Sequence, residues 1–195
     1  MWKQSLLKFA RNEYNKREEL DGSVASISPT PYDLMQQVLQ DNIFSTIVSH
    51  DNDLLMFVDL GCGDGRWLEQ ILDHKFNFNC MCFGVEIDNE RIELAKTRCS
   101  NAIATSSSIQ LPKFKRFEII KSDIRHYPLH LMNVIIVYLS IKGNELIKEK
   151  IANECSKGSI IIAVGFAIKE LPRLILYKQY ESSSGLKLYI YNCVL

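Results

Sequence analysis

The segment Leu54–Leu72 constrains the fold most, because an uninterrupted apolar run leads into a cluster of glycines and then into a helical pattern. Residues 55–60 are typical of a strand that is buried on both sides, as strands of parallel sheets are. Gly61, Gly63 and Gly65 follow, and glycines at a strand end let the backbone turn sharply and approach a ligand. The next helix offers free N–H groups to an electron-rich ligand. The segment therefore predicts a strand–turn–helix unit with a ligand at the turn.

Apolar, strand-like runs alternate with helical patterns through most of the remaining chain. Helical spacing is clearest in residues 66–73, 88–99 and 144–155, where apolar side chains recur every three or four positions. The predicted strands around these helices are residues 55–60, 80–87, 117–123, 133–140 and 159–168. Such alternation predicts a mostly parallel sheet with helices on both of its faces.

The C-terminal segment breaks this alternation. Residues 173–181 and 186–194 are two β-rich runs, and the sequence Ser-Ser-Ser-Gly joins them. Two such runs around a short polar loop predict an antiparallel hairpin. We therefore expect an α/β fold: a three-layer αβα Rossmann-like sandwich whose seven-stranded, mostly parallel sheet ends in a C-terminal antiparallel hairpin.

The sequence predicts an N-terminal segment that is separate from the main domain. We expect residues 1–29 to form a helix and a linker, and residues 30–195 to form one domain. Trp2, Leu6 and Phe9 fall on one helical face, with basic residues nearby, which also fits a mitochondrial presequence or a membrane-surface helix. The glutamates that follow argue against a presequence, so a helix lying on the domain is favoured. No apolar run approaches the length of a transmembrane helix.

Charge and cysteine usage exclude several classes of protein. The chain has 23 basic and 23 acidic residues, so neither nucleic acid nor an anionic membrane is indicated as an obligatory partner. Its 6 cysteines form no C-x-x-C pair, and no set of cysteines and histidines has zinc-like spacing, so no metal is expected. Buried thiols in a reducing compartment are the favoured interpretation. We expect a cytoplasmic location, with mitochondria as the alternative.

Two carboxylates at the glycine cluster limit what the ligand can be. The dinucleotide motif G-x-G-x-x-G fails because position 66 is an arginine, and no Walker P-loop is present. Asp59 stands just before the turn and Asp64 stands within it. Two carboxylates facing a pyrophosphate would be electrostatically costly, whereas they would favour an ammonium group or hydroxyls. The pattern predicts a nucleoside that carries a cation.

These residues resemble the class I S-adenosylmethionine-dependent methyltransferases. Residues 58–65, VDLGCGDG, resemble motif I of that family, and residues 84–88 and 121–124, GVEID and KSDI, end the next two predicted strands. In the family the acid at Glu86 holds the ribose hydroxyls and the acid at Asp123 meets the adenine amine. The resemblance implies S-adenosylmethionine as the cofactor. It implies a binding set of Thr30, Asp59, Gly61, Gly63, Asp64, Gly65, Glu86, Ile87, Asp123 and Ile124.

Two further segments resemble a narrower family. Residues 29–31 read Pro-Thr-Pro, and residues 137–140 read VYLS before a helix rich in leucine and lysine. Both are similar to the small protein-lysine methyltransferases that modify the ATP synthase c-subunit and the adenine nucleotide translocase, and to their bacterial relatives. Ser140 and Ile141 stand where that family has a proline region, and Cys62 stands where it has a serine. The resemblance implies a protein lysine side chain as the methyl acceptor.

Thr30 has two interpretations. It can cap a helix in which Pro31 takes the first position and Asp33 completes a capping box, and this is slightly favoured. Alternatively, Thr30 and Tyr32 close over the cofactor.

Tyr138 is the candidate catalytic residue, because residues after the fourth strand line the acceptor pocket in the family. The expected reaction is an in-line methyl transfer, in which the enzyme aligns the two groups and excludes water. A lysine must first lose a proton, which surroundings of low dielectric favour. The ring of Tyr138 can hold the ammonium by a cation–π contact, and its hydroxyl can orient the amine. A packed strand-end aromatic is an equally good interpretation. His126 and His130 are interpreted as solvent-exposed loop residues.

Two other functions remain open at this point. One is an RNA or small-molecule methyltransferase, which a basic group at Lys113, Lys115, Arg116 and Lys121 slightly supports, although a solvated charge run is the simpler explanation. The other is a cofactor-binding subunit without catalysis. The sequence leaves the oligomeric state, the target lysine and the methylation state open.

Overall fold

In the computed structural model, residues 29–41, 43–48, 53–106 and 114–194 are described. The predicted N-terminal helix of residues 1–29 therefore lies almost wholly outside the described residues, and its separation from residues 30–195 stays a prediction. Among the helices of the described ranges, none is both long enough and apolar enough to cross a membrane.

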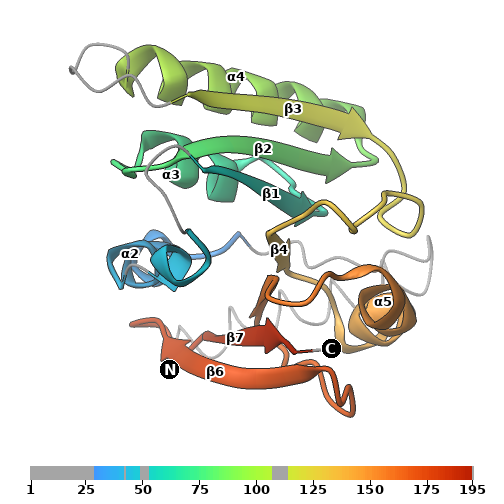
Figure 1. Ribbon diagram of the computed structural model, residues 1–195. Coiled ribbons are helices and arrows are strands. Elements are labelled where there is room, and N and C mark those ends of the chain that lie inside the picture. The colour runs from blue at the N-terminus through green and yellow to red at the C-terminus, as the bar shows by residue number, and fades with distance from the viewer. Residues whose placement is uncertain (1–28, 42, 49–52, 107–113, 195) are drawn as a thin grey trace.

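Seven strands form one sheet, as the sequence predicts (Figure 1). They are β1 (Leu54–Leu60), β2 (Asn79–Glu86), β3 (Lys115–Lys121), β4 (Val134–Val137), β5 (Ile160–Val164), β6 (Leu174–Glu181) and β7 (Lys187–Cys193). Their order is β3-β2-β1-β4-β5-β7-β6. The first five are parallel, whereas β7 runs antiparallel to both β5 and β6. The order reverses between β1 and β4, and ligands of open α/β sheets bind beyond the carboxyl ends of strands at such a reversal.

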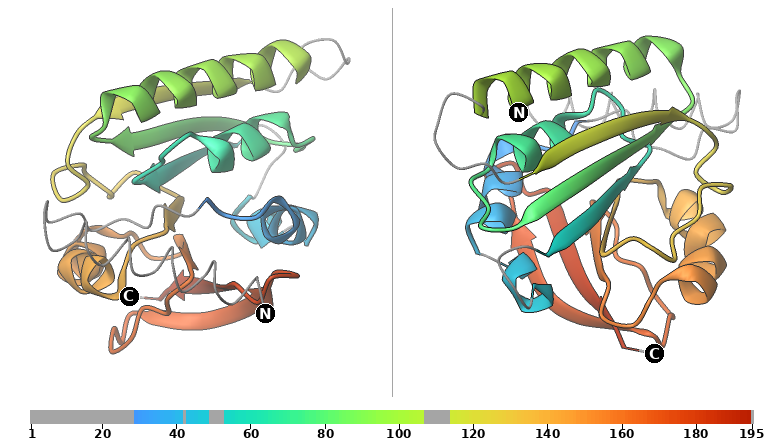
Figure 2. Two further views of the ribbon diagram at one scale, coloured as in Figure 1. Left: turned by 180° about the vertical axis from the view of Figure 1, so that it is seen from behind. Right: turned by 45° about the horizontal axis from the view of Figure 1, so that its top comes forward.

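Helices cover both faces of the sheet, which completes the three predicted layers (Figures 1 and 2). The helices are α2 (Tyr32–Gln40), the 3-10 helix η1 (Ile43–Ile47), α3 (Arg66–Asp73), α4 (Asn89–Ser106) and α5 (Ile141–Glu154). Side chains of α2, η1, α3 and α4 join one buried cluster, and those of α5 join a second cluster on the opposite face. The strand β1 lies between them, since Phe57 belongs to the first cluster and Val58 to the second. Burial on both sides explains its uninterrupted apolar sequence.

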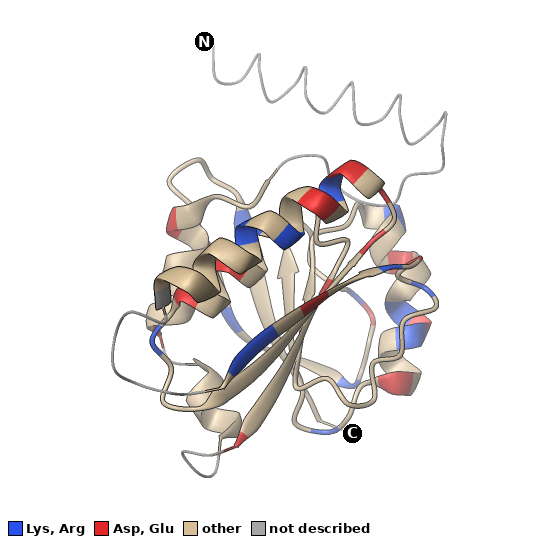
Figure 3. Ribbon diagram, turned by 90° about the horizontal axis from the view of Figure 1, so that it is seen from above, with Lys and Arg blue, Asp and Glu red and all other residues tan. Residues whose placement is uncertain are grey.

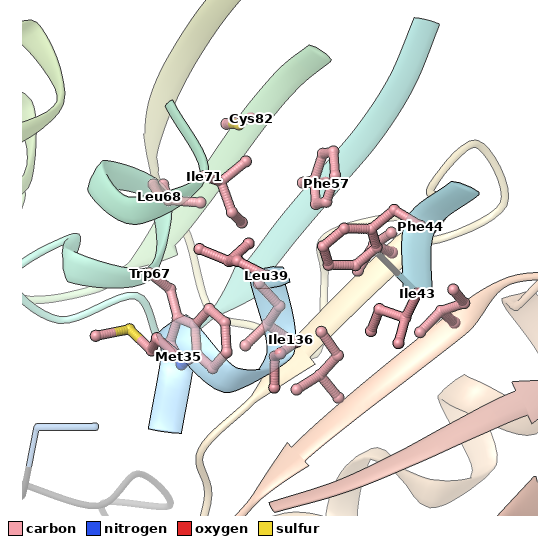
Figure 4. Close-up of a cluster of buried hydrophobic side chains, with 14 of the residues drawn as sticks. Met35, Leu39, Ile43, Phe44, Phe57, Trp67, Leu68, Ile71, Cys82 and Ile136 are labelled. Carbon is pink, nitrogen blue, oxygen red and sulfur yellow. The ribbon is translucent and has the colours of Figure 1, made fainter. Parts of the chain in front are cut away.

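Aromatic side chains anchor the first cluster, where η1 meets β1 (Figure 4). The Phe44 ring packs edge-on against Phe57, with 5.2 Å between the ring centroids. Phe76 stacks on Phe78 at 4.4 Å. Such pairs add about 0.5–1.5 kcal/mol each to the stabilisation from burial alone. The cluster holds α2 and α3 against one face of the sheet.

The capping prediction for Thr30 was wrong. Pro31 is the N-cap of α2, with φ −62° and ψ 141°. The Thr30 hydroxyl instead accepts a hydrogen bond from the Trp67 indole at 3.1 Å, in a buried position. Asp33 does not form a capping box, because its carboxylate accepts from the backbone N–H groups of Leu34 and Ser183. Thr30 therefore joins the start of α2 to α3.

The basic residues near β3 do not form one exposed face. Lys115 points inward, and its ammonium donates to the carbonyl oxygens of Leu72 and His74 at the end of α3, at 2.6 Å and 2.5 Å. Arg116 lies over the ring of Phe114, and Lys113 lies outside the described residues. Figure 3 shows acidic and basic residues interspersed along α4 and α5. The charge pattern therefore no longer supports an RNA substrate.

Candidate functional site

The glycine turn lies at the carboxyl end of β1, next to the point where the strand order reverses. Gly61, Gly63 and Gly65 all have positive φ, at 81°, 55° and 76°. The backbone N–H groups of Gly61 and Cys62 donate to the carbonyl oxygen of Val85, at 2.8 Å and 3.0 Å. These bonds join the turn to β2, so the sharp turn has a fixed position over the edge of the sheet.

The glycines have different surroundings. A Cβ added to Gly65 would lie 2.8 Å from the Cα of Ala95, because α4 packs directly on the turn. At Gly63, no atom of the described residues lies within 4 Å of the place of a Cβ. Gly65 is therefore required for packing, whereas Gly63 leaves an open side on which a ligand can approach the backbone.

Glu86 is the last residue of β2 and holds the glycine turn by hydrogen bonds. Its side chain is buried, at 5% exposed. Its Oε2 accepts from the backbone N–H of Gly63 at 2.9 Å, and its Oε1 accepts from those of Ile87 and Asp88 at 2.8 Å and 3.0 Å. A carboxylate has about four lone-pair sites and three are occupied here, so Glu86 can still accept one hydrogen bond from a ligand. A ribose hydroxyl is a suitable donor.

Asp59 has the largest pKa shift among the acids at this edge of the sheet. It is the penultimate residue of β1 and is 4% exposed. Burial, followed by the nearby charges of Glu86 and Asp64, raises its pKa to about 8. A buried acid with a raised pKa at the end of a strand is characteristic of functional sites. A cationic ligand would offset the repulsion among these carboxylates and favour the ionised form of Asp59.

Asp64 has two guanidinium partners. Its Oδ2 lies 2.9 Å from Nη2 of Arg66 and 3.0 Å from Nη2 of Arg98. Burial alone would raise its pKa, but the hydrogen bonds and charge of Arg66, together with the charge of Arg98, lower it overall. The structure thus uses the Asp64 carboxylate to fix the turn. Its contact with a ligand stays a prediction.

Arg98 was missed by the sequence analysis. Its guanidinium donates to the carbonyl oxygen of Asp64 at 3.1 Å, to the Tyr32 hydroxyl at 3.1 Å and to Oε2 of Glu69 at 3.3 Å. It therefore connects the turn with the first residue of α2 and with α3. The helical pattern places Arg98 one residue before the buried Cys99, beside the apolar stripe of α4. That position is the signal in the sequence that could have identified it.

The segment after β3 carries the other predicted acid. Arg125 donates to the carboxylate of Asp123 through its backbone N–H and its guanidinium. This pairing lowers the pKa of Asp123 to about 2, so the acid is ionised at neutral pH. Ile124 is buried, whereas Ile87 after β2 is exposed. Because β2 and β3 pair in parallel, these residues lie at the same edge as the turn.

Tyr138 follows β4 at this same edge. It is partly buried and packs against the first cluster, and a Cβ added to Gly165 after β5 would lie 2.9 Å from its ring carbon Cε2. The strand β4 pairs with β1, so Tyr138 comes one residue beyond the level of Leu60. Thr30 was also predicted for the site, but its hydroxyl bonds to Trp67 on α3. The described residues contain no group of three or more His, Cys, Asp or Glu side chains suited to a metal ion.

Comparisons with known proteins agree with this geometry. The model of the ANTKMT methyltransferase domain matches residues 59–174, which is more than half of the chain. A protein-lysine N-methyltransferase of Saccharolobus islandicus (strain REY15A) is 26% identical over 164 residues, covering 84% of this chain and 90% of that protein.

Solved structures share the fold. An RNA methyltransferase from Salinibacter ruber, in complex with S-adenosyl-L-homocysteine, has a TM-score of 0.64 at 17% identity, over 86% of this chain and 94% of that one. A methyltransferase from Pyrococcus furiosus has a TM-score of 0.52 at 17% identity, over 96% and 98% of the two chains. Together with the turn, the acids and the strand order, these findings show that the chain belongs to the ANTKMT methyltransferase family and is an S-adenosylmethionine-dependent enzyme.

Proposed function

We propose that the chain is a protein-lysine N-methyltransferase. The observation that carries this proposal is its similarity to the Saccharolobus islandicus protein-lysine N-methyltransferase along almost the whole length of both proteins. The inward position of Lys115 supports it indirectly, because the charge argument for an RNA substrate depended partly on that residue.

We propose the residues at the carboxyl edge as the cofactor site, because their chemistry fits S-adenosylmethionine. The open side of Gly63 admits a ligand, and Asp59 and Glu86 are buried acids that suit a cation and hydroxyl groups. Asp123 is ionised and able to accept from an adenine amine, and Ile124 offers an apolar surface near it. The remaining members of the proposed set are Gly61, Asp64, Gly65, Ile87 and, through Trp67, Thr30.

The chain's own part in the reaction is to align an amine and keep it neutral. When bound, S-adenosylmethionine supplies a methyl group on a positively charged sulfur. Alignment of the acceptor with that group contributes most of the rate enhancement in such transfers. Burial near the apolar side chains of β4 lowers the pKa of an incoming lysine and so favours its reactive form. Tyr138 lies where its ring and hydroxyl can orient this amine.

We expect Tyr138→Phe to lower kcat for methyl-lysine formation by about fivefold to tenfold, since one hydrogen bond contributes about 1 kcal/mol. The affinity for S-adenosylhomocysteine should stay within about twofold, because the ring remains in place and loses only its hydroxyl. The measurement is an initial rate with labelled cofactor and a protein extract. An unchanged rate would mean that Tyr138 serves packing alone.

We expect S-adenosylmethionine to bind more tightly as the pH rises from about 6 to about 8. The pKa of Asp59 is raised from 3.8 to about 8, so the ligand-free enzyme holds a proton there below pH 8. A cation favours the ionised form, so binding releases this proton, and affinity rises by up to about tenfold per pH unit below the pKa. Calorimetry in buffers of different ionisation enthalpy measures the release. Proton uptake, or binding of S-adenosylmethionine without proton release, would contradict the role of Asp59.

The experiment that tests the acceptor class offers labelled S-adenosylmethionine with a protein extract and, separately, with total RNA. We expect the label in the protein pool, resistant to RNase and recovered as methyl-lysine after hydrolysis. Label confined to RNA would replace the proposal with the alternative substrate. No transfer to either pool, with the cofactor still bound, would indicate a non-catalytic subunit.

A further inference from the structure

A buried amide oxygen after β4 lacks a hydrogen-bond partner. Asn144 lies on the inner side of α5 and is 4% exposed. Its Oδ1 is buried and has no hydrogen-bond partner among the described residues. Leaving such a group unsatisfied costs about 1–3 kcal/mol, so a buried polar atom of this kind requires an explanation.

The orientation of the amide is fixed by its other end. Nδ2 of Asn144 donates to the carbonyl oxygen of Phe166 at 3.2 Å. Rotating the amide by 180° would place two acceptors against each other, because a carbonyl oxygen cannot donate. The oxygen therefore does not bond to Phe166 and is left as a buried acceptor without a donor among the described residues.

Asn144 lies between the two segments that follow β4 and β5. Its backbone N–H donates to the carbonyl oxygen of Ser140, at 2.9 Å. Its side chain holds Phe166, and the neighbouring Gly165 packs on the ring of Tyr138. Asn144 therefore contacts the segment after β4, which contains Tyr138, and the segment after β5, which packs on the Tyr138 ring.

The segment that contains Phe166 is irregular. It runs from Gly165 to Arg173 between β5 and β6, and Glu170 within it has a φ of 55°, which a residue other than glycine seldom adopts. The described bonds that hold its middle are from the Ile168 N–H to the Tyr191 hydroxyl, at 3.1 Å, and the ion pair of Glu170 with Lys148, at 3.6 Å. Backbone strain of this kind is concentrated at ligand sites.

We propose that Oδ1 of Asn144 accepts a hydrogen bond from the substrate's ε-amine, an inference that rests on the proposed lysine specificity. A neutral lysine amine has two N–H donors and one lone pair, and the lone pair has to point at the transferred methyl group. One N–H bonded to Asn144 and the other facing Tyr138 would direct the lone pair away from both residues. An amide suits this task better than a carboxylate, because a negative charge would favour the unreactive ammonium.

The test compares Asn144→Leu with Asn133→Leu. The substitution at Asn144 is close to isosteric and removes the unpartnered acceptor, but it also breaks the Nδ2 bond to Phe166, so we expect the Tm to fall about as much as for Asn133→Leu. Asn133 lies just before β4, at the amino edge, where its Oδ1 accepts from the backbone N–H of Met56 at 2.8 Å. Asn133→Leu breaks that bond, so it should lower the Tm and leave the activity at temperatures well below the Tm unchanged.

The expected result at Asn144 is a loss of about tenfold to a hundredfold in the rate of methyl-lysine formation in a protein extract, with the affinity for S-adenosylhomocysteine within about twofold. A merely structural role would lower the Tm and spare the rate, as at Asn133, and would overturn the inference while lysine methylation by the wild type stands. If the wild type forms no methyl-lysine, the proposed function fails and this inference fails with it. Methyl-lysine formation by the wild type therefore distinguishes failure of the proposed function from failure of the Asn144 inference alone.

Discussion

Replacing Glu86 with glutamine is expected to weaken the binding of S-adenosylhomocysteine by about a hundredfold or more, since each hydrogen bond to a charged group contributes about 1.5–3 kcal/mol. The Glu86 carboxylate accepts from Gly63 on one oxygen and from Ile87 and Asp88 on the other. An amide NH₂ on either side would face a backbone N–H, so the variant loses both the turn's anchor and an acceptor for the ribose. Isothermal titration calorimetry measures the effect.

The matched control for this prediction is Glu90→Gln, four residues later in the first turn of α4, where the side chain is exposed. We expect its affinity for S-adenosylhomocysteine to stay within about twofold of the wild type. A thermal melt of Glu86→Gln verifies that the variant is folded at the titration temperature. A folded Glu86→Gln protein with wild-type affinity would refute the ribose assignment.

Gly65→Ala is expected to lower the free energy of unfolding by about 3 kcal/mol. A φ of 76° costs an alanine about 1 kcal/mol, and overpacking typically adds 1–3 kcal/mol. The overpacking is severe because the added Cβ would lie 2.8 Å from the Cα of Ala95, and helix backbone cannot rotate aside as a side chain can. Urea unfolding followed by circular dichroism measures the loss.

Gly63→Ala is the control for Gly65→Ala. Its Cβ meets no described atom within 4 Å, so only the backbone term remains and we expect about 1 kcal/mol. The same methyl group would occupy the proposed ligand side, so Gly63→Ala should lose affinity for S-adenosylhomocysteine while it keeps most of its stability. Equal destabilisation by the two variants would contradict the close packing of α4 on the turn.

The sheet was predictable because its signals are local. The apolar run of β1 and the glycines after it mark one strand–turn–helix unit, and the hairpin of β6 and β7 is marked by its polar loop. Some element limits were less accurate for the same reason. The fourth strand was expected to run to Ser140, whereas Ser140 is the N-cap of α5 and its hydroxyl accepts from Gly143. Gly165, with a φ of 80°, ends β5 earlier than the apolar sequence indicates.

The parts of the site that the sequence did not reveal depend on contacts between distant residues. Thr30 bonds to Trp67, and Asp64 pairs with Arg98, more than thirty positions along the chain in each case. Spacing along one helix or strand carries no information about such pairs, because tertiary packing decides them. The N-terminal helix, the cytoplasmic location and the oligomeric state stay predictions or open questions.

The most direct test of the account incubates the enzyme and a protein extract with S-adenosylmethionine that carries a heavy methyl group, and locates the label by mass spectrometry. We expect the heavy methyl on lysine ε-nitrogens with the wild type and at most a trace with Glu86→Gln. Label on another side chain, or equal label with both enzymes, would contradict a lysine methyltransferase whose cofactor is held by Glu86.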